Sequence, residues 1–265
     1  MSIPSLAAVI TAAGSSSRFS NGLEQPVKKE YLSIDGHTVL YRAAVPFFEI
    51  PTLSAVIITC PEGSEDETAV ALEDLIDINT IPVLIVPGGQ NRKESVSKAL
   101  DVLSQLPCSY EYIAVHDGAR PFLTSRLVIK TLASAALSGA SVPASLISDA
   151  VRRLGSDGLI SEIIPKRGLV TVQTPQIFTA ENLLLAYQIY QEEDADDDLE
   201  VYSAAGFPCS FNPGDPANKK ITYLEDIPDA KEQVKAYLEA RDKGRRSGAA
   251  IRRMRQLSSM REEEE

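Results

Sequence analysis

The chain has 265 residues, of which 44% are apolar and 24% are charged, an ordinary composition for a globular protein. Its net charge of −11 argues against broad nucleic-acid binding. No apolar run reaches the length of a membrane span, and the N-terminus lacks the charged-then-apolar profile of a signal peptide. The three cysteines lie far apart without Cys-x-x-Cys spacing, so we expect reduced thiols in a cytoplasmic protein.

The first predicted element is a buried strand at residues 7–11 that runs directly into a loop of small residues. Ala12, Ala13 and Gly14 are followed by three serines and then by Arg18. Small side chains let backbone N–H groups approach an anion closely, and Arg18 adds a fixed cationic fork. The loop matches neither a Walker loop nor the three-glycine dinucleotide fingerprint. It suits the phosphates of a nucleotide, and an ordinary strand-to-helix connection is the alternative.

Two lysines, Lys28 and Lys29, follow this loop at short distance in the sequence. Cations that close over a phosphate chain suit phosphoryl or nucleotidyl transfer, in which charge stabilisation dominates catalysis. A solvated pair on the surface is the alternative, and only the neighbouring loop favours the phosphate interpretation.

Strand-like and helix-like segments then alternate, which indicates a parallel sheet covered on both faces. The predicted strands are residues 55–59, 83–86 and 112–115, and the predicted helices are residues 38–48, 66–76 and 92–106. Ligands of such sheets bind beyond the carboxyl ends of the strands. The polar turns at 14–18, 88–92 and 116–120 should therefore meet at one rim.

Asp117 comes directly after a strand-like run and precedes small residues and Arg120. A carboxylate at this rim can coordinate Mg²⁺ together with substrate phosphate oxygens. The alternative is that Asp117 caps the next helix, and Arg120 either pairs with it or holds the turn. In the turn at 88–92, Gly89 opens a helix in which Ser95 lies one turn along, so its hydroxyl could read a base or a ribose.

The pattern changes at residues 142–177, where the segments around the turn at 155–158 predict an antiparallel hairpin arm. A helix at 180–190, a short strand at 219–225 and a helix at 227–241 are expected to follow. We expect one domain over residues 1–240, followed by a disordered charged tail at 241–265.

Taken together, these segments closely resemble the 2-C-methyl-D-erythritol 4-phosphate cytidylyltransferases of the non-mevalonate isoprenoid pathway, from about Ala8 to Ala230. The resemblance is carried by Ala12-Ala13-Gly14 with Arg18, Lys29-Glu30-Tyr31, Gly88-Gly89 with Arg92 and Ser95-Val96, Val115 to Pro121, Gln173-Thr174-Pro175-Gln176, and Asn218 to Thr222. It implies a Rossmann-like, mostly parallel twisted α/β sheet with helices on both faces and a protruding β-hairpin dimerisation arm. It also implies a homodimer that transfers CMP from CTP to 2-C-methyl-D-erythritol 4-phosphate with the aid of Mg²⁺, giving 4-CDP-2-C-methyl-D-erythritol and pyrophosphate.

The resemblance further implies roles for individual residues. Arg18 and Lys29 resemble the pair that stabilises the transition state at the α-phosphate, and Lys220 resembles the lysine that orients the acceptor phosphate. A cation from the partner's arm, here Lys166 or Arg167, would join it. Asp117 would lie near Mg²⁺. The residues implied to bind CTP are Ala12, Ala13, Gly14, Gly89, Arg92, Ser95, Asp117, Arg120 and Thr174.

Most departures from the family pattern fall on the acceptor side. Asp149-Ala150 stands where the family has Asp-Thr, and Asp196-Asp197 stands where it has Thr-Asp. Ser16 replaces a loop glycine, which a small residue tolerates. These departures keep another acceptor, such as ribitol 5-phosphate, as an alternative to methylerythritol phosphate. A silent nucleotide-binding regulatory protein is the non-enzyme alternative, which the retained Arg18 and Lys29 disfavour.

Overall fold

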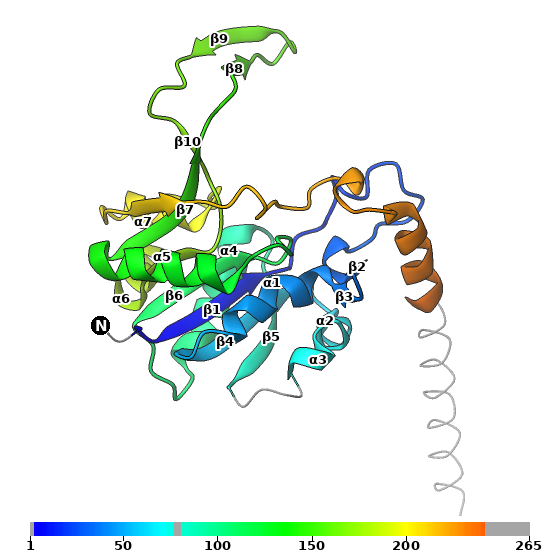
Figure 1. Cartoon of the computed structure of the whole chain (residues 1–265), viewed down its shortest axis with the longest axis horizontal. Coiled ribbons are helices and arrows are strands. Elements are labelled where there is room, and N and C mark those ends of the chain that lie inside the picture. Colours follow the sequence, from blue (N-terminus) through cyan, green and yellow to red (C-terminus); the bar gives the residue numbers. More distant parts are fainter. Residues whose placement is uncertain (1–2, 77–80, 242–265) are drawn as a thin grey trace, which may run out of the picture.

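An eight-stranded mixed sheet forms the centre of the computed structural model, which describes residues 3–76 and 81–241 (Figure 1). Its strand order is β10-β7-β11-β6-β1-β4-β5. The eighth strand, β12, pairs with β7 and lies off this path. The four strands β6, β1, β4 and β5 run parallel, whereas β11 is antiparallel to both β6 and β7. The strands of this sheet are β1 Leu6–Thr11, β4 Leu53–Cys60, β5 Val83–Pro87, β6 Tyr112–Asp117, β7 Ala140–Leu146, β10 Val170–Val172, β11 Gln176–Thr179 and β12 Ser210–Pro213.

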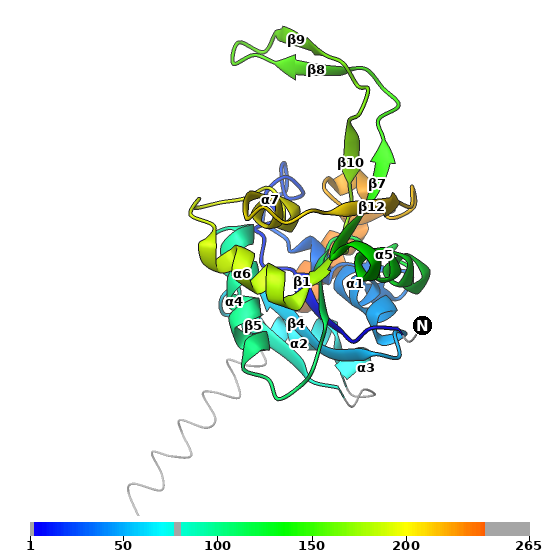
Figure 2. The same ribbon diagram turned by 90° about the vertical axis from the view of Figure 1, so that its left-hand side faces the viewer.

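Helices cover both faces of this sheet. They are α1 Val39–Phe48, α2 Glu65–Ala71, α3 Glu73–Ile76, α4 Arg92–Ser104, α5 Ser125–Ser138, α6 Ala180–Ile189 and α7 Asp198–Ala204. One apolar cluster joins α1, α2, α3 and α5 to one face, and a second joins α4, α6 and α7 to the other. Figure 2 shows the two layers on opposite sides of the sheet. The predicted α/β fold, mostly parallel and covered on both faces, is therefore confirmed.

Strand β1 lies at the centre of the parallel part and is buried on both faces. Ala8 and Ile10 belong to one apolar cluster and Ala7 and Val9 to the other, and none of the four is exposed. Because side chains alternate along a strand, a strand covered on both faces needs a continuous apolar run. Polar residues begin only where β1 ends, and this places the small-residue loop at the edge of the sheet.

A third apolar cluster fastens the N-terminal loop to the C-terminal part of the chain. Phe19 and Val27 of the loop pack with Ile221, Ile227 and Val234. The two-stranded ribbon of β2 (Ser33–Ile34) and β3 (His37–Thr38) and the helical segment at 230–241 flank this cluster. Burial of Phe19, which is 1% exposed, fixes the backbone directly after Arg18.

Beyond β7, strands β8 (Val151–Leu154) and β9 (Ile160–Ile164) form the predicted antiparallel hairpin, which projects away from the sheet (Figures 1 and 2). Large apolar side chains on it are open to solvent: Leu154, Leu159, Ile160 and Ile163 are each more than 60% exposed. The hairpin in the sequence prediction is thus confirmed, and its role in dimerisation stays a prediction.

Two predicted elements are wrong. The helix expected at 66–76 is broken into α2 and α3, since Leu72 leaves the helical conformation (φ −120°, ψ 6°). The strand expected at 219–225 is a loop followed by a 3₁₀ turn at Leu224–Asp226. There, the Asp226 carboxylate accepts hydrogen bonds from the Thr222 and Tyr223 N–H groups (2.6 and 2.8 Å), so these donors do not join a neighbouring strand.

The last predicted helix, at 227–241, begins at residue 230 and continues to residue 241. The predicted tail lies outside the described residues except for Arg241, the last residue that the structure describes. The single-domain boundary at residue 240 stays a prediction. Among the described residues, no helix is long and apolar enough to cross a membrane.

Candidate active site

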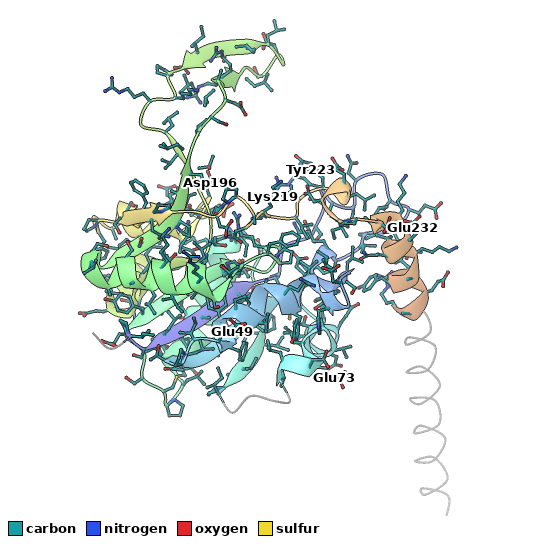
Figure 3. The ribbon with its side chains drawn as sticks, in the orientation of Figure 1. Glu49, Glu73, Asp196, Lys219, Tyr223 and Glu232 are labelled. Carbon is teal, nitrogen blue, oxygen red and sulfur yellow. The ribbon has the colours of Figure 1, made fainter. Side chains whose placement is uncertain are left out.

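A cleft of about 830 Å³ opens beyond the carboxyl ends of β1, β5 and β6. The three polar turns predicted to meet at one rim all line it. Its lining comprises Thr11, residues 13–19 and 26–31, Gly89 to Arg92, Ser95, Asp117, Ala119, Lys220, Thr222 and, at its outer end, Pro61, Ser64, Glu67, Tyr237 and Arg241. Figure 3 places Lys219 and Tyr223 along this edge of the molecule, and Glu49 and Glu73 near the opposite edge.

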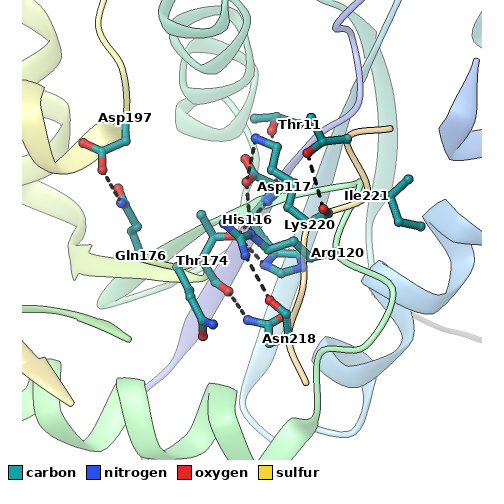
Figure 4. A network of polar contacts seen from close by, with 12 residues as sticks. Thr11, His116, Asp117, Arg120, Thr174, Gln176, Asp197, Asn218, Lys220 and Ile221 are labelled. Atoms are coloured by element: carbon teal, nitrogen blue, oxygen red, sulfur yellow. Dashed lines mark hydrogen bonds and ion pairs between the residues drawn. The ribbon is translucent and has the colours of Figure 1, made fainter. Parts of the chain in front are cut away.

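Asp117, the last residue of β6, gathers three cations on the floor of the cleft. Its Oδ2 atom lies 3.0 Å from Lys220 Nζ and 3.1 Å from Arg120 Nε (Figure 4). Its Oδ1 atom lies 3.7 Å from Arg92 Nε. Burial alone would raise the pKa of Asp117, but Lys220, Arg92 and Arg120 together hold it well below the usual range. The carboxylate is therefore ionised at any pH where the protein works.

The two alternative roles considered for this turn can now be separated. Helix α5 is capped by Thr124, whose side chain accepts a hydrogen bond from the Leu127 N–H, so Asp117 does not cap it. Arg120 makes two polar contacts. It pairs with Asp117, and its Nη1 atom donates to the Asn218 carbonyl oxygen at 3.0 Å, which holds the C-terminal loop beside the turn.

Arg92, at the start of α4, is held by a second and fully buried carboxylate. Its Nη2 atom lies 2.6 Å from Asp198 Oδ2, and the Tyr187 hydroxyl donates to Asp198 Oδ1 at 2.7 Å. Burial alone would lower the pKa of Arg92, but Asp198 and Asp117 raise it, so the guanidinium stays charged. Neither Asp198 nor Tyr187 was identified from the sequence, although Asp198 is the last residue of the acidic run at 192–198.

Lys29 is the buried cation of the cleft that has no carboxylate partner within the described part of the chain. It is 8% exposed, and its Nζ atom donates to the Ile221 carbonyl oxygen at 2.6 Å. Burial lowers the pKa of Lys29, and the neighbouring charges of Lys220 and Lys28 lower it further, against Glu30, which raises it. An anion that entered the cleft would relieve this repulsion, so the site is built to receive negative charge.

The two glycine turns lie in direct contact at the rim. A Cβ atom on Gly88 would lie 2.3 Å from Ala13 Cβ, so only glycine lets the second turn lie against the first. Ser95 braces the second turn, since its hydroxyl accepts from the Gly89 N–H (2.9 Å) and donates to the Asn91 carbonyl oxygen (2.8 Å). The Ser95 hydroxyl is therefore occupied by the turn itself.

Thr174 supports the floor from beneath. Its hydroxyl accepts a hydrogen bond from the Asp117 N–H (3.1 Å) and contacts His116 Nδ1 (2.9 Å), while Asn218 Nδ2 donates to its carbonyl oxygen (2.8 Å; Figure 4). Thr174 is 4% exposed and does not line the cleft. Its position suits a group that orients Asp117 more than one that touches a nucleotide.

The structure brings together most of the predicted site. Arg18 is exposed at the mouth of the cleft, while Ala12 is buried beneath it. Lys166 and Arg167 are exposed in the loop between β9 and β10 and do not line the cleft of their own chain. Asp196 and Ala150 are also exposed and outside its lining. Among the residues predicted for the acceptor side, Lys220 lines the cleft, whereas Lys166, Arg167, Ala150 and Asp196 do not.

Comparisons with known proteins agree with this geometry. The family model described as "IspD: 2-C-methyl-D-erythritol 4-phosphate cytidylyltransferase" matches residues 6–236. The chain is similar to the 2-C-methyl-D-erythritol 4-phosphate cytidylyltransferase of Caldanaerobacter subterraneus subsp. tengcongensis, with 32% identity covering 84% of this chain and 95% of that protein. It is also similar to the bifunctional enzyme IspD/IspF of Desulforudis audaxviator, with 34% identity covering 83% of this chain and 54% of that protein. The chain therefore spans about half the length of the bifunctional relatives it matches.

Solved structures give the same result for the fold. The 2-C-methyl-D-erythritol 4-phosphate cytidylyltransferase of Thermus thermophilus has a TM-score of 0.66 and 26% identity, covering 86% of this chain and 98% of that one. The 4-diphosphocytidyl-2C-methyl-D-erythritol synthase of Anaerococcus prevotii has a TM-score of 0.70 and 24% identity, covering 89% of this chain and 96% of that one. The second likeness supports the fold alone.

We predict that His116 makes the folded protein less stable in mild acid. Burial lowers the pKa of His116 to about 3, so the ring stays neutral in the folded state but gains a proton in the unfolded state below about pH 6.5. The stabilisation of the folded state that comes from this neutral ring is complete above about pH 6.5 and is lost as the pH falls toward 3. Between pH 6.5 and 5 the free energy of unfolding should drop by about 2 kcal/mol because of this residue.

Denaturant titrations at each pH would measure this effect. His116→Gln should flatten the dependence between pH 6.5 and 5. The control is His37→Gln, since His37 is the other of the two histidines and is exposed, and it should leave the slope as in the wild type. Equal slopes for His116→Gln and the wild type would contradict the assignment.

Proposed function

The chain belongs to the 2-C-methyl-D-erythritol 4-phosphate cytidylyltransferase family, and on that basis we propose that it transfers CMP from CTP to 2-C-methyl-D-erythritol 4-phosphate. The products would be 4-CDP-2-C-methyl-D-erythritol and pyrophosphate. One observation carries the proposal: Lys220, Arg92 and Arg120 converge on Asp117 at the floor of a nucleotide-sized cleft, which Lys29 also lines. The comparisons do not favour the other two candidates, a different polyol phosphate as acceptor and a silent nucleotide-binding protein.

The proposed chemistry needs no nucleophile from the protein. An oxygen of the acceptor phosphate attacks the α-phosphorus of CTP, and the bond from that phosphorus to the bridging oxygen breaks as pyrophosphate leaves. Negative charge redistributes over the α-phosphate oxygens during this exchange, so fixed positive charge beside them lowers the barrier. Lys29, buried and lacking a carboxylate partner among the described residues, suits this task, and Arg18 at the mouth would add a second cation.

Mg²⁺ would fit this site only together with the nucleotide. Among the described residues, no group of three or more His, Cys, Asp or Glu side chains is placed to hold a metal ion. Asp117 is the carboxylate at the floor, and Mg²⁺ commonly takes one or two carboxylates and completes its shell with phosphate oxygens and water. When bound, the ion would neutralise phosphate charge. Asp117 would then exchange part of its contact with Lys220 and Arg120 for the metal.

A second copy of the chain would complete the acceptor side. The exposed apolar residues of the β8–β9 arm support this proposal, because contiguous exposed apolar surface marks an interface. Lys166 or Arg167 of the partner's arm would then approach Lys220. Sedimentation velocity should show a dimer, and a monomer at catalytic concentrations would rule out this part of the proposal.

The free thiols Cys60, Cys108 and Cys209 support the proposal of a cytoplasmic enzyme.

The decisive experiment is a panel of acceptors with pyrophosphate release as the readout. CTP and Mg²⁺ are incubated with the enzyme and either 2-C-methyl-D-erythritol 4-phosphate or ribitol 5-phosphate. Pyrophosphate should be released only when 2-C-methyl-D-erythritol 4-phosphate is the acceptor. Turnover with the second would revive the alternative raised by Ala150 and Asp196, and no release with either would leave a nucleotide-binding protein.

Replacing either Lys29 or Arg18 should affect the chemical step more than CTP binding. We expect Lys29→Met and Arg18→Ala each to lower kcat by roughly 10²-fold or more, with a much smaller rise in KM for CTP. The control is Arg42→Met, which removes a cation paired with Asp35 outside the cleft. A near-normal kcat for either variant would disprove its role at the α-phosphate.

Lys220 should serve the acceptor and not the nucleotide. Lys220→Ala is therefore expected to lower acceptor use and kcat while CTP binding, measured by calorimetry, stays within about threefold of the wild type, because most CTP contacts would come from the N-terminal loops. Lys219→Ala is the matched control, since Lys219 is the neighbouring lysine but does not line the cleft. Loss of CTP affinity together with turnover would instead place Lys220 on the nucleotide.

A further inference from the structure

A buried ion pair lies within the N-terminal loop, beside Lys29 but separate from it. Lys28 Nζ lies 3.0 Å from Glu30 Oε2, and the two side chains are only 10% and 6% exposed. A buried carboxylate is unexpected in a cleft that is to receive a triphosphate, because it repels other anions. Its presence therefore needs a physical reason.

Both partners of the pair hold the small-residue loop. Lys28 Nζ also donates to the Gly14 carbonyl oxygen, and Glu30 Oε2 accepts a hydrogen bond from the Ser16 hydroxyl at 3.1 Å. Ser16 has a φ of +53°, a left-handed conformation that costs free energy for a residue other than glycine. The bond to Glu30 offsets this cost. The loop is thus braced at Gly14 and Ser16, the residues on either side of Ser15.

The charges of the pair are already satisfied by each other and by the loop. Lys28 directs its ammonium to Glu30 and Gly14, whereas the adjacent Lys29 has no carboxylate partner among the described residues. Lys28 is therefore placed to bind groups of the protein itself, and Lys29 is placed to bind an anionic ligand. If Lys28 were absent, the Glu30 carboxylate would stand unpaired beside the incoming phosphates.

We propose that Lys28 and Glu30 act as one positioning unit, which shapes the 14–18 loop for the triphosphate and keeps the Glu30 charge neutralised. The inference rests on the proposed function, since it takes CTP as the ligand. It assigns Lys28 no contact with the nucleotide. Its signature is that loss of Lys28 weakens CTP binding far more while the Glu30 charge remains than after that charge is removed.

A double-mutant cycle on the full chain tests this signature. CTP is titrated by calorimetry into the wild type, Lys28→Met, Glu30→Gln and the double variant, and kcat and KM are measured for each. Lys28→Met should weaken CTP binding by about tenfold or more, because it leaves a buried anion beside the phosphates. Glu30→Gln keeps a hydrogen-bond acceptor for Ser16 and should stay within about threefold of the wild type. The double variant should bind CTP within about threefold of Glu30→Gln, a much smaller loss than Lys28→Met causes in the wild type, because only the Lys28 hydrogen bond to the Gly14 carbonyl oxygen is then removed.

A direct contact between Lys28 and the phosphates would give a different result. If Lys28 contacts the phosphates itself, its loss will cost as much in the Glu30→Gln background as in the wild type, and additive effects would overturn the proposal. Should Lys28→Met fail to fold, comparison of the double variant with Glu30→Gln still decides the question. Arg42→Met with Asp35→Asn is the matched control pair outside the cleft. Failure of the wild type to bind CTP would instead reject the proposed function.

Discussion

One buried carboxylate organises the cationic side of this cleft. Asp117 lies at the end of β6, where three cations from separate parts of the chain reach it: Arg92 from α4, Arg120 from the turn after β6, and Lys220 from the C-terminal loop. Without Asp117 these like charges would repel one another in a poorly solvated place. With it, they are held close while an excess of positive charge remains. A chain with a net charge of −11 thereby presents a local site for phosphates.

The rest of the structure serves to hold that carboxylate and its partners in place. Strand β1 carries the loop toward the rim, and β6 beside it carries Asp117, in a parallel register that pairs Thr11 with Asp117. Thr174 fixes the Asp117 backbone from below, and Asp198 fixes Arg92 from the side. The C-terminal segment closes the arrangement because it supplies Lys220 and holds Lys29 through the Ile221 carbonyl oxygen.

Much of this could be predicted from local sequence. Continuous apolar runs that alternate with helical segments predict a covered parallel sheet, and the rule that ligands bind at the carboxyl ends then placed Gly14, Gly89 and Asp117 at one rim. One error arose where a hydrogen-bonding side chain nearby in the sequence overrides the residue pattern. The apolar and β-branched residues at 219–225 suggested a strand, but Asp226 takes the N–H groups that a strand would have used.

The missed residues share a physical cause. Asp198 and Tyr187 act on Arg92 from about one hundred positions away, and no spacing rule reveals a pair so distant in the chain. The difference between Lys28 and Lys29 is equally invisible in sequence, because it depends on which way each side chain leaves a 3₁₀ turn at Lys29–Tyr31. Lys166, Arg167 and Asp196 stay unassigned for another reason: they are exposed and lie outside the lining of the cleft, so no contact shows which ligand they serve.

If three cations hold Asp117 ionised, its carboxylate should not titrate in the ordinary acid range. The ¹³C chemical shift of the Asp117 carboxyl group, assigned by its disappearance in Asp117→Asn, would be followed from pH 7 to pH 3. We expect this shift to stay flat over the whole range, because the pKa of Asp117 lies well below the usual value of about 3.9. A titration midpoint at about 4 or above would mean that Lys220, Arg92 and Arg120 do not act on Asp117 as described.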